Sequence, residues 1–208
     1  MHNPSGNVVS NSLPSGPRAV SPAVTLVAQL GPAHRPLIAR HLLALPSDDR
    51  RLRFGHAISD ASIARYVRGL RFTRDAAFGA FDDDGHLYGF GHLAFAPNAI
   101  PPEFGISVDP AVRRQGIGLK LLMRAGEHAR NRGQRLLMML FVPENKALAT
   151  LAQRAGMRLV ADPYEPSAYL SLEEASPESL LREAFGEAVA AIDLGFRLGG
   201  AAGRSTSA

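Results

Sequence analysis

The most informative absence in this 208-residue sequence is cysteine, which does not occur at all. A chain without thiols forms no disulfide bond, has no thiolate nucleophile, and offers no sulfur ligand to zinc or to an iron–sulfur cluster. Its stability therefore has to come from an ordinary hydrophobic core. The length is sufficient for one, because a chain of this size buries roughly 70% of its unfolded surface on folding.

Long hydrophobic runs are also absent. No apolar stretch approaches the roughly 18 residues that a membrane span requires. The beginning of the sequence lacks the basic segment and apolar segment of a secretory signal. With 46% hydrophobic and 20% charged residues, the composition predicts a globular protein located in the cytoplasm, without a membrane partner.

Two further classes of ligand lack their sequence signals. The seven histidines show no metal-ligand spacing, so we predict no metal site. The basic N-terminal part has little aromatic interleaving and no nucleic-acid reading motif, so we predict no nucleic-acid partner.

The formal net charge of +4 is an average over blocks of opposite sign. Residues 110–135 contain six Arg and one Lys against one Glu, whereas residues 75–109 contain six acids and no Lys or Arg. Residues 162–193 are again strongly acidic. A compact basic block favours a locally bound anion over a long polyanion, and the acidic blocks favour a cationic substrate.

Periodicity and turn residues predict a mixed central β-sheet with helices on both faces, an α/β (α+β) architecture. Expected strands cover residues 24–30, 76–81, 87–95, 103–108, 136–142, 157–161 and 168–172. Expected helices cover residues 34–45, 47–54, 60–70, 117–132, 145–154 and 176–194. We expect a flexible Pro/Ser-rich leader over residues 1–22, a domain over 23–175, a C-terminal helix within 176–198, and a disordered tail over 199–208.

A glycine-rich turn lies between an expected strand and a long expected helix. Its sequence is Arg113-Arg-Gln-Gly116-Ile-Gly118. The first backbone N–H groups of a helix are free and lie at the positive end of its dipole, which suits a phosphate, and glycine allows close approach. A dinucleotide-binding fingerprint would need glycine where Leu121 stands, and a nucleotide P-loop would need Gly-Lys-Ser/Thr, which the surroundings of Lys120 do not provide.

The remaining pattern, Arg113-x-x-Gly116-x-Gly118, resembles the acetyl-coenzyme A pyrophosphate loop of the GCN5-related N-acetyltransferases (GNATs). The resemblance extends over about residues 76–160. An acidic residue opens the strand before the loop, and the buried strand after it is followed by Asn145 and by a short helix that ends at Gly156. More loosely, the segment 51–54, Arg-Leu-Arg-Phe, is similar to the bacterial protein-lysine acetyltransferase branch of that family.

The resemblance implies a GNAT fold with acetyl-CoA as cosubstrate. The strand segment Ile106, Ser107 and Val108 would pair through its backbone with the pantetheine arm, as an added strand does. The pyrophosphate would be held by N–H groups from Arg113, Arg114, Gln115, Gly116, Ile117, Gly118 and Leu119. Asn145 would bind the pantetheine or order the loop; the alternative is a helix N-cap, and both roles can coexist.

Transfer of an acetyl group from a thioester to an amine needs a base for the amine and a proton donor for the thiolate. By the resemblance, Glu103 is the expected base, although a solvated acid at a strand end would look the same in sequence. The usual tyrosine donor is replaced by Ala152. Tyr164 is our expected substitute, with Tyr88, Tyr169, Ser107 and His92 as alternatives. For Tyr164 and Tyr169, the sequence favours buried packing with a satisfied hydroxyl over a catalytic role, and His92 lies in an apolar strand typical of a hydrogen-bonded core residue.

We therefore predict an N-acetyltransferase that passes the acetyl group directly to a primary amine of a small molecule or a protein lysine. The missing tyrosine leaves open a non-catalytic or partner-dependent coenzyme A-binding protein. Arg50, Arg51 and Arg53 are interpreted as a solvated helix face. The last helix has an apolar face, Leu180, Leu181, Phe185, Val189 and Ile192, which either packs on its own domain or forms a homodimer contact.

Overall fold

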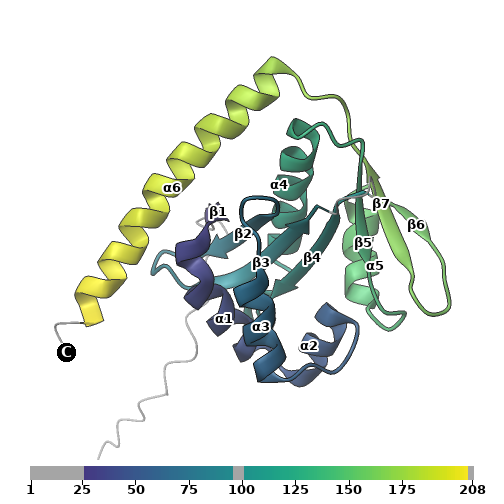
Figure 1. Ribbon diagram of the computed structural model, residues 1–208, viewed down its shortest axis with the longest axis horizontal. Helices are drawn as coiled ribbons and strands as arrows, with labels where there is room; N and C mark the ends of the chain where they lie inside the picture. The colour runs from purple at the N-terminus through teal and green to yellow at the C-terminus, as the bar shows by residue number, and fades with distance from the viewer. Residues whose placement is uncertain (1–25, 96–100, 206–208) are drawn as a thin grey trace, which may run out of the picture.

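The computed structural model describes residues 26–95 and 101–205. Within them a seven-stranded sheet has the order β1-β2-β3-β4-β5-β7-β6, with helices on both faces (Figure 1). The predicted mixed sheet is confirmed, because every neighbouring pair is antiparallel except β4 and β5, which are parallel. The predicted leader lies outside the described residues.

The elements follow the sequence pattern closely. The strands are β1 (Leu26–Leu30), β2 (Ala76–Phe81), β3 (Leu87–Ala94), β4 (Glu103–Val108), β5 (Leu136–Leu140), β6 (Arg158–Val160) and β7 (Ser167–Ser171). The helices are α1 (Arg35–Ala44), α2 (Ser47–Phe54), α3 (Asp60–Gly69), α4 (Ile117–Asn131), α5 (Lys146–Arg154) and α6 (Pro177–Ser205).

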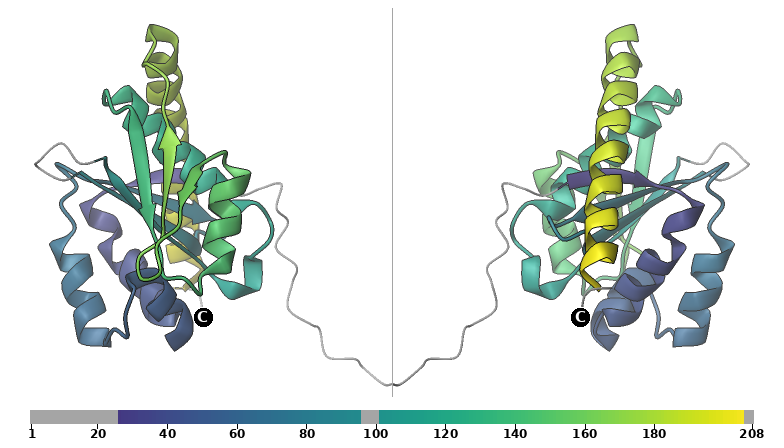
Figure 2. Two further views of the ribbon diagram at one scale, coloured as in Figure 1. Left: turned by 90° about the vertical axis from the view of Figure 1, so that its right-hand side faces the viewer. Right: turned by 90° about the vertical axis from the view of Figure 1, so that its left-hand side faces the viewer.

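Two hydrophobic cores lie on opposite faces of the sheet. One is formed by α4 with side chains such as Phe78 and Phe104, and the other by α1 and α3 with side chains such as Phe81 and Phe90. Because side chains alternate along a strand, β4 directs its even-numbered residues to α4 and its odd-numbered residues to α1, α2 and α3. Figure 2 shows the α1–α3 group on one side of the strands.

Strands β4 and β5 separate soon after they meet. Their only backbone pairing within the described residues is Glu103 with Met138, together with a bond from the Met138 N–H to the Pro102 carbonyl of 2.9 Å. Beyond Glu103 the edge of β4 has no partner strand, which leaves a gap that runs toward the glycine-rich turn.

One strand is less buried than its sequence suggests. Residues 136–142 are all apolar and predict a strand buried on both faces, but β5 ends at Leu140 and Leu136 is 37% exposed, while Leu137 and Met139 are fully buried. The prediction of two-sided burial is wrong because α1, α2 and α3 cover the sheet only as far as β4.

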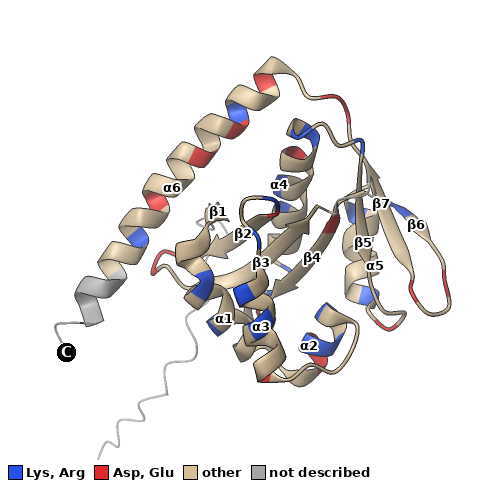
Figure 3. Ribbon diagram, viewed as in Figure 1, with Lys and Arg blue, Asp and Glu red and all other residues tan. Residues whose placement is uncertain are grey.

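Helix α6 packs across the β1 edge of the sheet and against α4 (Figure 2). Ser176 caps it, accepting a 3.1 Å bond from the Ser179 N–H, while Ser179 Oγ accepts from the Ser176 N–H at 3.0 Å. Its packed side is partly polar: Glu183 accepts from Arg124 at 2.9 Å and contacts His128 at 2.7 Å. Charges of both signs follow the helix (Figure 3).

None of the helices within residues 26–95 and 101–205 combines the length and the hydrophobicity that crossing a bilayer would take.

Candidate active site

A pocket of about 670 Å³ opens where β4 leaves β5. Its walls are the second half of β4, the glycine-rich turn with the start of α4, helix α5, and helix α2. Of the residues predicted to bind the cofactor, all except Gln115 line it. Segments that are as much as a hundred positions apart in the sequence therefore meet at one concave surface.

The turn has the backbone geometry that an anion needs. Gly116 has a φ of +80° and Arg114 a φ of +63°, both in the left-handed region. Such a conformation costs of order 1–3 kcal/mol for a residue with a side chain. No described group accepts a hydrogen bond from the backbone N–H groups of residues 114–119, and α4 has no side-chain cap. These donors converge at a helix N-terminus and are free for a phosphate.

Arg113 has a different environment from the rest of the turn. Its N–H donates to the Pro110 carbonyl at 3.4 Å, its guanidinium lies 2.9 Å from an Asp49 carboxylate oxygen, and its Nε donates to the Val108 carbonyl at 3.0 Å. The side chain thus ties α2 to the turn and is already paired. The run of free donors begins at Arg114, one residue later than the sequence prediction.

The open edge of β4 presents alternate backbone groups. The Asp109 N–H donates to Tyr88 of β3 at 2.8 Å, and Ser107 pairs with Phe90 on the same strand. Since polar groups alternate between the two sides of an antiparallel strand, those of Ile106 and Val108 face the gap. Ile106 and Val108 are therefore positioned to pair with an extended chain, whereas the backbone of Ser107 is used by β3.

The side chain of Ser107 is held by a residue that the sequence analysis missed. His41 Nε2 lies 2.9 Å from Ser107 Oγ, and both residues are buried. Burial lowers the pKa of His41 to about 4. His92 has the same state: burial, followed by the positive charge of Arg53, lowers its pKa to about 4. No sequence motif marks His41, because its partner is 66 residues away.

These two histidines make stability depend on pH. A histidine that is neutral in the folded protein but takes a proton at pKa 6.5 when unfolded contributes stability that is lost as pH falls from 6.5 toward 4. We expect the free energy of unfolding to fall by about 2 kcal/mol per histidine between pH 7 and pH 5. Urea unfolding at both pH values measures it. His41→Gln should remove about half of the decrease, whereas substitution of the exposed His56 should leave it unchanged; an unchanged slope in His41→Gln would contradict the assignment.

Asn145 has the N-cap geometry that was the alternative interpretation. Its Oδ1 accepts from the Leu148 N–H at 3.0 Å, and its Nδ2 lies 3.4 Å from the Leu52 carbonyl of α2. The residue lines the pocket while joining α5 to α2. A cofactor contact is compatible with this position and stays a prediction.

The two predicted catalytic residues lie on different parts of the fold, and neither lines the pocket. Glu103 is exposed at the first position of β4, beside the point where β4 and β5 part. Tyr164 is 88% exposed in the segment between β6 and β7 and does not line the pocket. Ala152 is fully buried on α5, so no hydroxyl takes the position of the usual tyrosine.

Arg53 differs most from its predicted role, because it is not a solvated residue. Its guanidinium lies over the rings of Phe54 and Tyr66, at 5.1 and 5.9 Å from their centroids, and Nη2 donates to the Tyr66 hydroxyl at 3.2 Å. A Cβ added to Gly105 would lie 2.5–2.6 Å from the guanidinium. The glycine of β4 is therefore what allows the arginine to lie against the strand.

Tyr66 connects this arginine to a buried polar chain. Its hydroxyl lies 2.9 Å from His92 Nδ1, and His92 Nε2 lies 3.6 Å from an Asp75 carboxylate oxygen. Asp75 is held in turn by Arg74 and by the Phe95 N–H. His92 is thus a hydrogen-bonded residue of the sheet face, as the sequence indicated, and Tyr66 is a contact that no spacing signalled.

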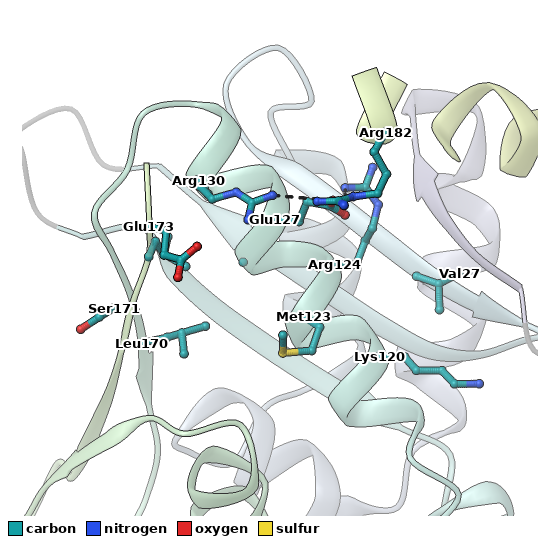
Figure 4. Close-up of a pocket in the computed structure, with 12 residues that line it drawn as sticks. Val27, Lys120, Met123, Arg124, Glu127, Arg130, Leu170, Ser171, Glu173 and Arg182 are labelled. Atoms are coloured by element: carbon teal, nitrogen blue, oxygen red, sulfur yellow. Dashed lines mark hydrogen bonds and ion pairs between the residues drawn. The ribbon is translucent and has the colours of Figure 1, made fainter. Parts of the chain in front are cut away.

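A second hollow, of about 770 Å³, lies on the outer side of α4, near β7 and the start of α6 (Figure 4). Several of its charged side chains form ion pairs: Glu127 lies 3.8 Å from Arg130 and 3.3 Å from Arg182. It contains none of the predicted site residues and no free helix N-terminus.

His128, Glu183 and Glu187 are the one group of described residues close enough to share a cation, with ligand atoms within 4.8 Å. Both carboxylates already accept hydrogen bonds from Arg124. A guanidinium at that distance opposes a second cation electrostatically. The absence of a metal stays a prediction.

Comparison with known proteins identifies this arrangement. The model of the Acetyltransferase (GNAT) family matches residues 42–157, more than half of the chain and all of the pocket-lining elements. The chain belongs to the GNAT acetyltransferase family. It is accordingly an N-acetyltransferase that uses acetyl-CoA. No curated protein sequence matches it.

Solved GNAT structures share the fold at low sequence identity. The GNAT domain of S. lividans PAT is 16% identical with a TM-score of 0.61, over 70% of this chain and 89% of that one. The spermidine N-acetyltransferase from Vibrio cholerae, in complex with CoA and spermine, is 14% identical with a TM-score of 0.57, over 72% and 96%. The putative acetyltransferase yncA from Salmonella typhimurium, with acetyl-CoA, is 16% identical with a TM-score of 0.56, over 73% and 96%.

Proposed function

We propose that this GNAT protein binds acetyl-CoA in the pocket between β4 and α5 and transfers the acetyl group directly to a primary amine that approaches Glu103. The observation that carries the proposal is the run of free N–H groups over residues 114–119 at the end of an unpaired strand edge. The donors would hold the pyrophosphate. Ile106 and Val108 would pair with the pantetheine, which directs the thioester along β4 toward Glu103.

The chemistry requires two proton movements. The amine must be neutral when its nitrogen attacks the thioester carbon, so a base removes the ammonium proton. The C–N bond then forms, the C–S bond breaks, and the thiolate takes up a proton. Glu103 is the proposed base, because its carboxylate is on the α1–α3 side of β4 at the mouth of the gap. Tyr164 is exposed and makes no side-chain contact with the described residues that would support it as the proton donor. We propose instead that solvent protonates the thiolate.

The charges of the protein bear on the acceptor. Acidic blocks in the sequence favour a cationic amine or a lysine, and the V. cholerae relative was solved with spermine. In the structure, however, many of these acids are paired with arginine: Asp75 with Arg74, Asp83 with Arg197, and Glu183 with Arg124. Arginine therefore neutralises part of the charge of the acidic blocks, and the acceptor class must be decided at the pocket itself.

The test of the proposal is release of free thiol from acetyl-CoA in the presence of a panel of primary amines. Turnover excludes the alternative of a non-catalytic coenzyme A-binding protein. Coenzyme A binding without turnover on any amine would favour that alternative, and no binding would remove the proposal altogether.

We further propose that α6 forms the predicted homodimer contact. The apolar face expected from the sequence points away from the body: Leu181 is 72%, Phe185 74% and Phe196 77% exposed. In an antiparallel pairing of two copies centred near residue 189, Leu181 faces Phe196 and Phe185 faces Ile192. The same apolar face is then used by both copies, as a two-fold interface requires.

The dimer is tested by sedimentation analysis of the full chain. The wild-type protein should be dimeric at micromolar concentration, and Phe185→Glu combined with Ile192→Glu should be monomeric. Val160→Glu, at a partly exposed apolar position on β6, is the matched control and should remain dimeric. A wild-type monomer at all concentrations, or an unchanged dimer in the double variant, would show that α6 is not the contact.

A further inference from the structure

The guanidinium of Arg53 is half-buried, and the described residues supply no carboxylate that forms an ion pair with it. Other arginines of the same region are paired, such as Arg50 with Asp60 and Arg113 with Asp49. No such ion pair is formed by Arg53, and its Nε is buried without a hydrogen-bond partner. Its one hydrogen bond goes to the neutral hydroxyl of Tyr66.

A charge in this state is unfavourable for the protein alone. Removing an ion from water costs several kcal/mol unless a counter-charge and hydrogen bonds replace the solvent. Stacking on Phe54 and Tyr66 offsets part of this desolvation penalty, because a guanidinium interacts favourably with aromatic rings. The remaining donors match the two oxygens of a carboxylate, which arginine binds in a planar, bidentate manner.

The position of Arg53 shows where such a carboxylate would lie. The residue lines the coenzyme A pocket, and its guanidinium lies against Gly105 of β4. Gly105 stands between Ile106, where the open edge begins, and Glu103, two residues before it. The proposed site of the cofactor phosphates, residues 114–119, is at the opposite end of this open edge. A carboxylate bound to Arg53 would therefore belong to a part of the substrate that lies near the reacting thioester carbon.

We propose that Arg53 binds a carboxylate on the reactive part of a substrate, so that the protein acylates amino acids or related amino-carboxylates, or transfers acyl groups that end in a carboxylate. The inference rests on the proposed function and narrows its substrate class. In the first case Arg53 holds the carboxylate of a zwitterion while Glu103 takes the proton of its ammonium group. In the second case Arg53 holds the distal carboxylate of a dicarboxylic thioester. Both place an anion at the same guanidinium.

The experiment compares matched substrates that differ only in that charge. The acceptor arm compares an amino acid with its amide, using acetyl-CoA as the donor. The donor arm compares succinyl-CoA with butyryl-CoA, using a primary amine that carries no carboxylate. We expect the wild-type protein to prefer the carboxylate form in one arm by at least about tenfold in kcat/KM. The arm that shows the preference identifies which substrate carries the anion.

Variants of two arginines on the same helix separate recognition from structure. Arg53→Gln should lower kcat/KM on the carboxylate substrate by at least about tenfold more than on its neutral counterpart, and Arg53→Lys should retain part of the preference. Arg51→Gln is the matched control, because Arg51 is on the same helix, is 41% exposed and lies 3.8 Å from Glu144. It should behave as the wild type.

Two results would overturn this inference. The first is equal rates on charged and neutral forms in both arms. The second is an equal loss of rate on every substrate in Arg53→Gln, which would assign the guanidinium to the stability of the site or of the transition state. Calorimetry with coenzyme A on the wild type and on each variant distinguishes failure of the proposed function from failure of this inference. Absence of coenzyme A binding by the wild-type protein refutes the proposed function. Binding of coenzyme A without any preference for the carboxylate substrates refutes only the role of Arg53.

Discussion

We expect Gly116→Leu to lower the affinity for coenzyme A by at least about 100-fold, or about 3 kcal/mol. Gly116 begins α4 with a φ of +80°, a conformation that leucine adopts only with strain. Its backbone also lies in the middle of the free N–H groups of residues 114–119. A side chain there would reorient these donors and occupy the space of the phosphates. Calorimetric titration with coenzyme A measures the effect directly.

The control for this variant is Gly133→Leu at the other end of α4. Gly133 has a φ of +77°, and a Cβ there would meet nothing within 4 Å, as at Gly116. The backbone strain is therefore matched, while the pocket is far away. Gly133→Leu should lose stability but bind coenzyme A as the wild type does. Equal affinity in Gly116→Leu and the wild type would mean that the turn is not the phosphate site.

The second large effect is expected at Glu103. Replacing it by glutamine keeps the size of the side chain but removes the carboxylate that would accept the ammonium proton. General-base catalysis contributes about 10²–10⁴-fold to a rate, so kcat/KM for acetyl transfer should fall by about 100-fold or more. The affinity for coenzyme A should not change, because Glu103 does not line the coenzyme A pocket.

Glu144→Gln provides the comparison for Glu103→Gln. Glu144 is exposed in the segment just before α5 and contacts Arg51 at 3.8 Å, so its loss removes a nearby negative charge without removing the proposed base. The control should retain near wild-type turnover. If Glu103→Gln remains fully active, the proton is removed by another group or by solvent, and Glu103 is a strand-end acid only.

Local sequence rules predicted most elements of this fold. Alternation and helical periodicity give every helix and strand to within a few residues, with the large exception of α6. That helix continues through Ser205 where the sequence indicated an end at Leu194. Its extension, residues 195–205, is rich in glycine and alanine, so the periodic signal fades although the helical backbone continues. Arg197, which donates to Asp82 and Asp83 of the β2–β3 turn, holds this part to the body.

The residues of the site also divide into those that the local sequence predicted and those that it did not. The turn was recognisable because its function depends on backbone conformation and on consecutive residues, and glycines 116 and 118 record that requirement in the sequence. Arg53, Tyr66 and His41 were not recognised, since each acts through a partner that is 13 to 66 residues away. A motif does not describe such contacts.

The sequence by itself therefore determined the elements, the phosphate-binding turn and the resemblance to the GNAT family, because these depend on short-range spacing and on glycine conformation. Only the tertiary structure decided which charges remain available for a substrate. It paired several of the acids that had suggested a cationic acceptor, and it packed Arg53 against Gly105 with no ion pair among the described residues. The physical reason is that the electrostatic role of a charge depends on its nearest partner and its exposure, and folding determines both.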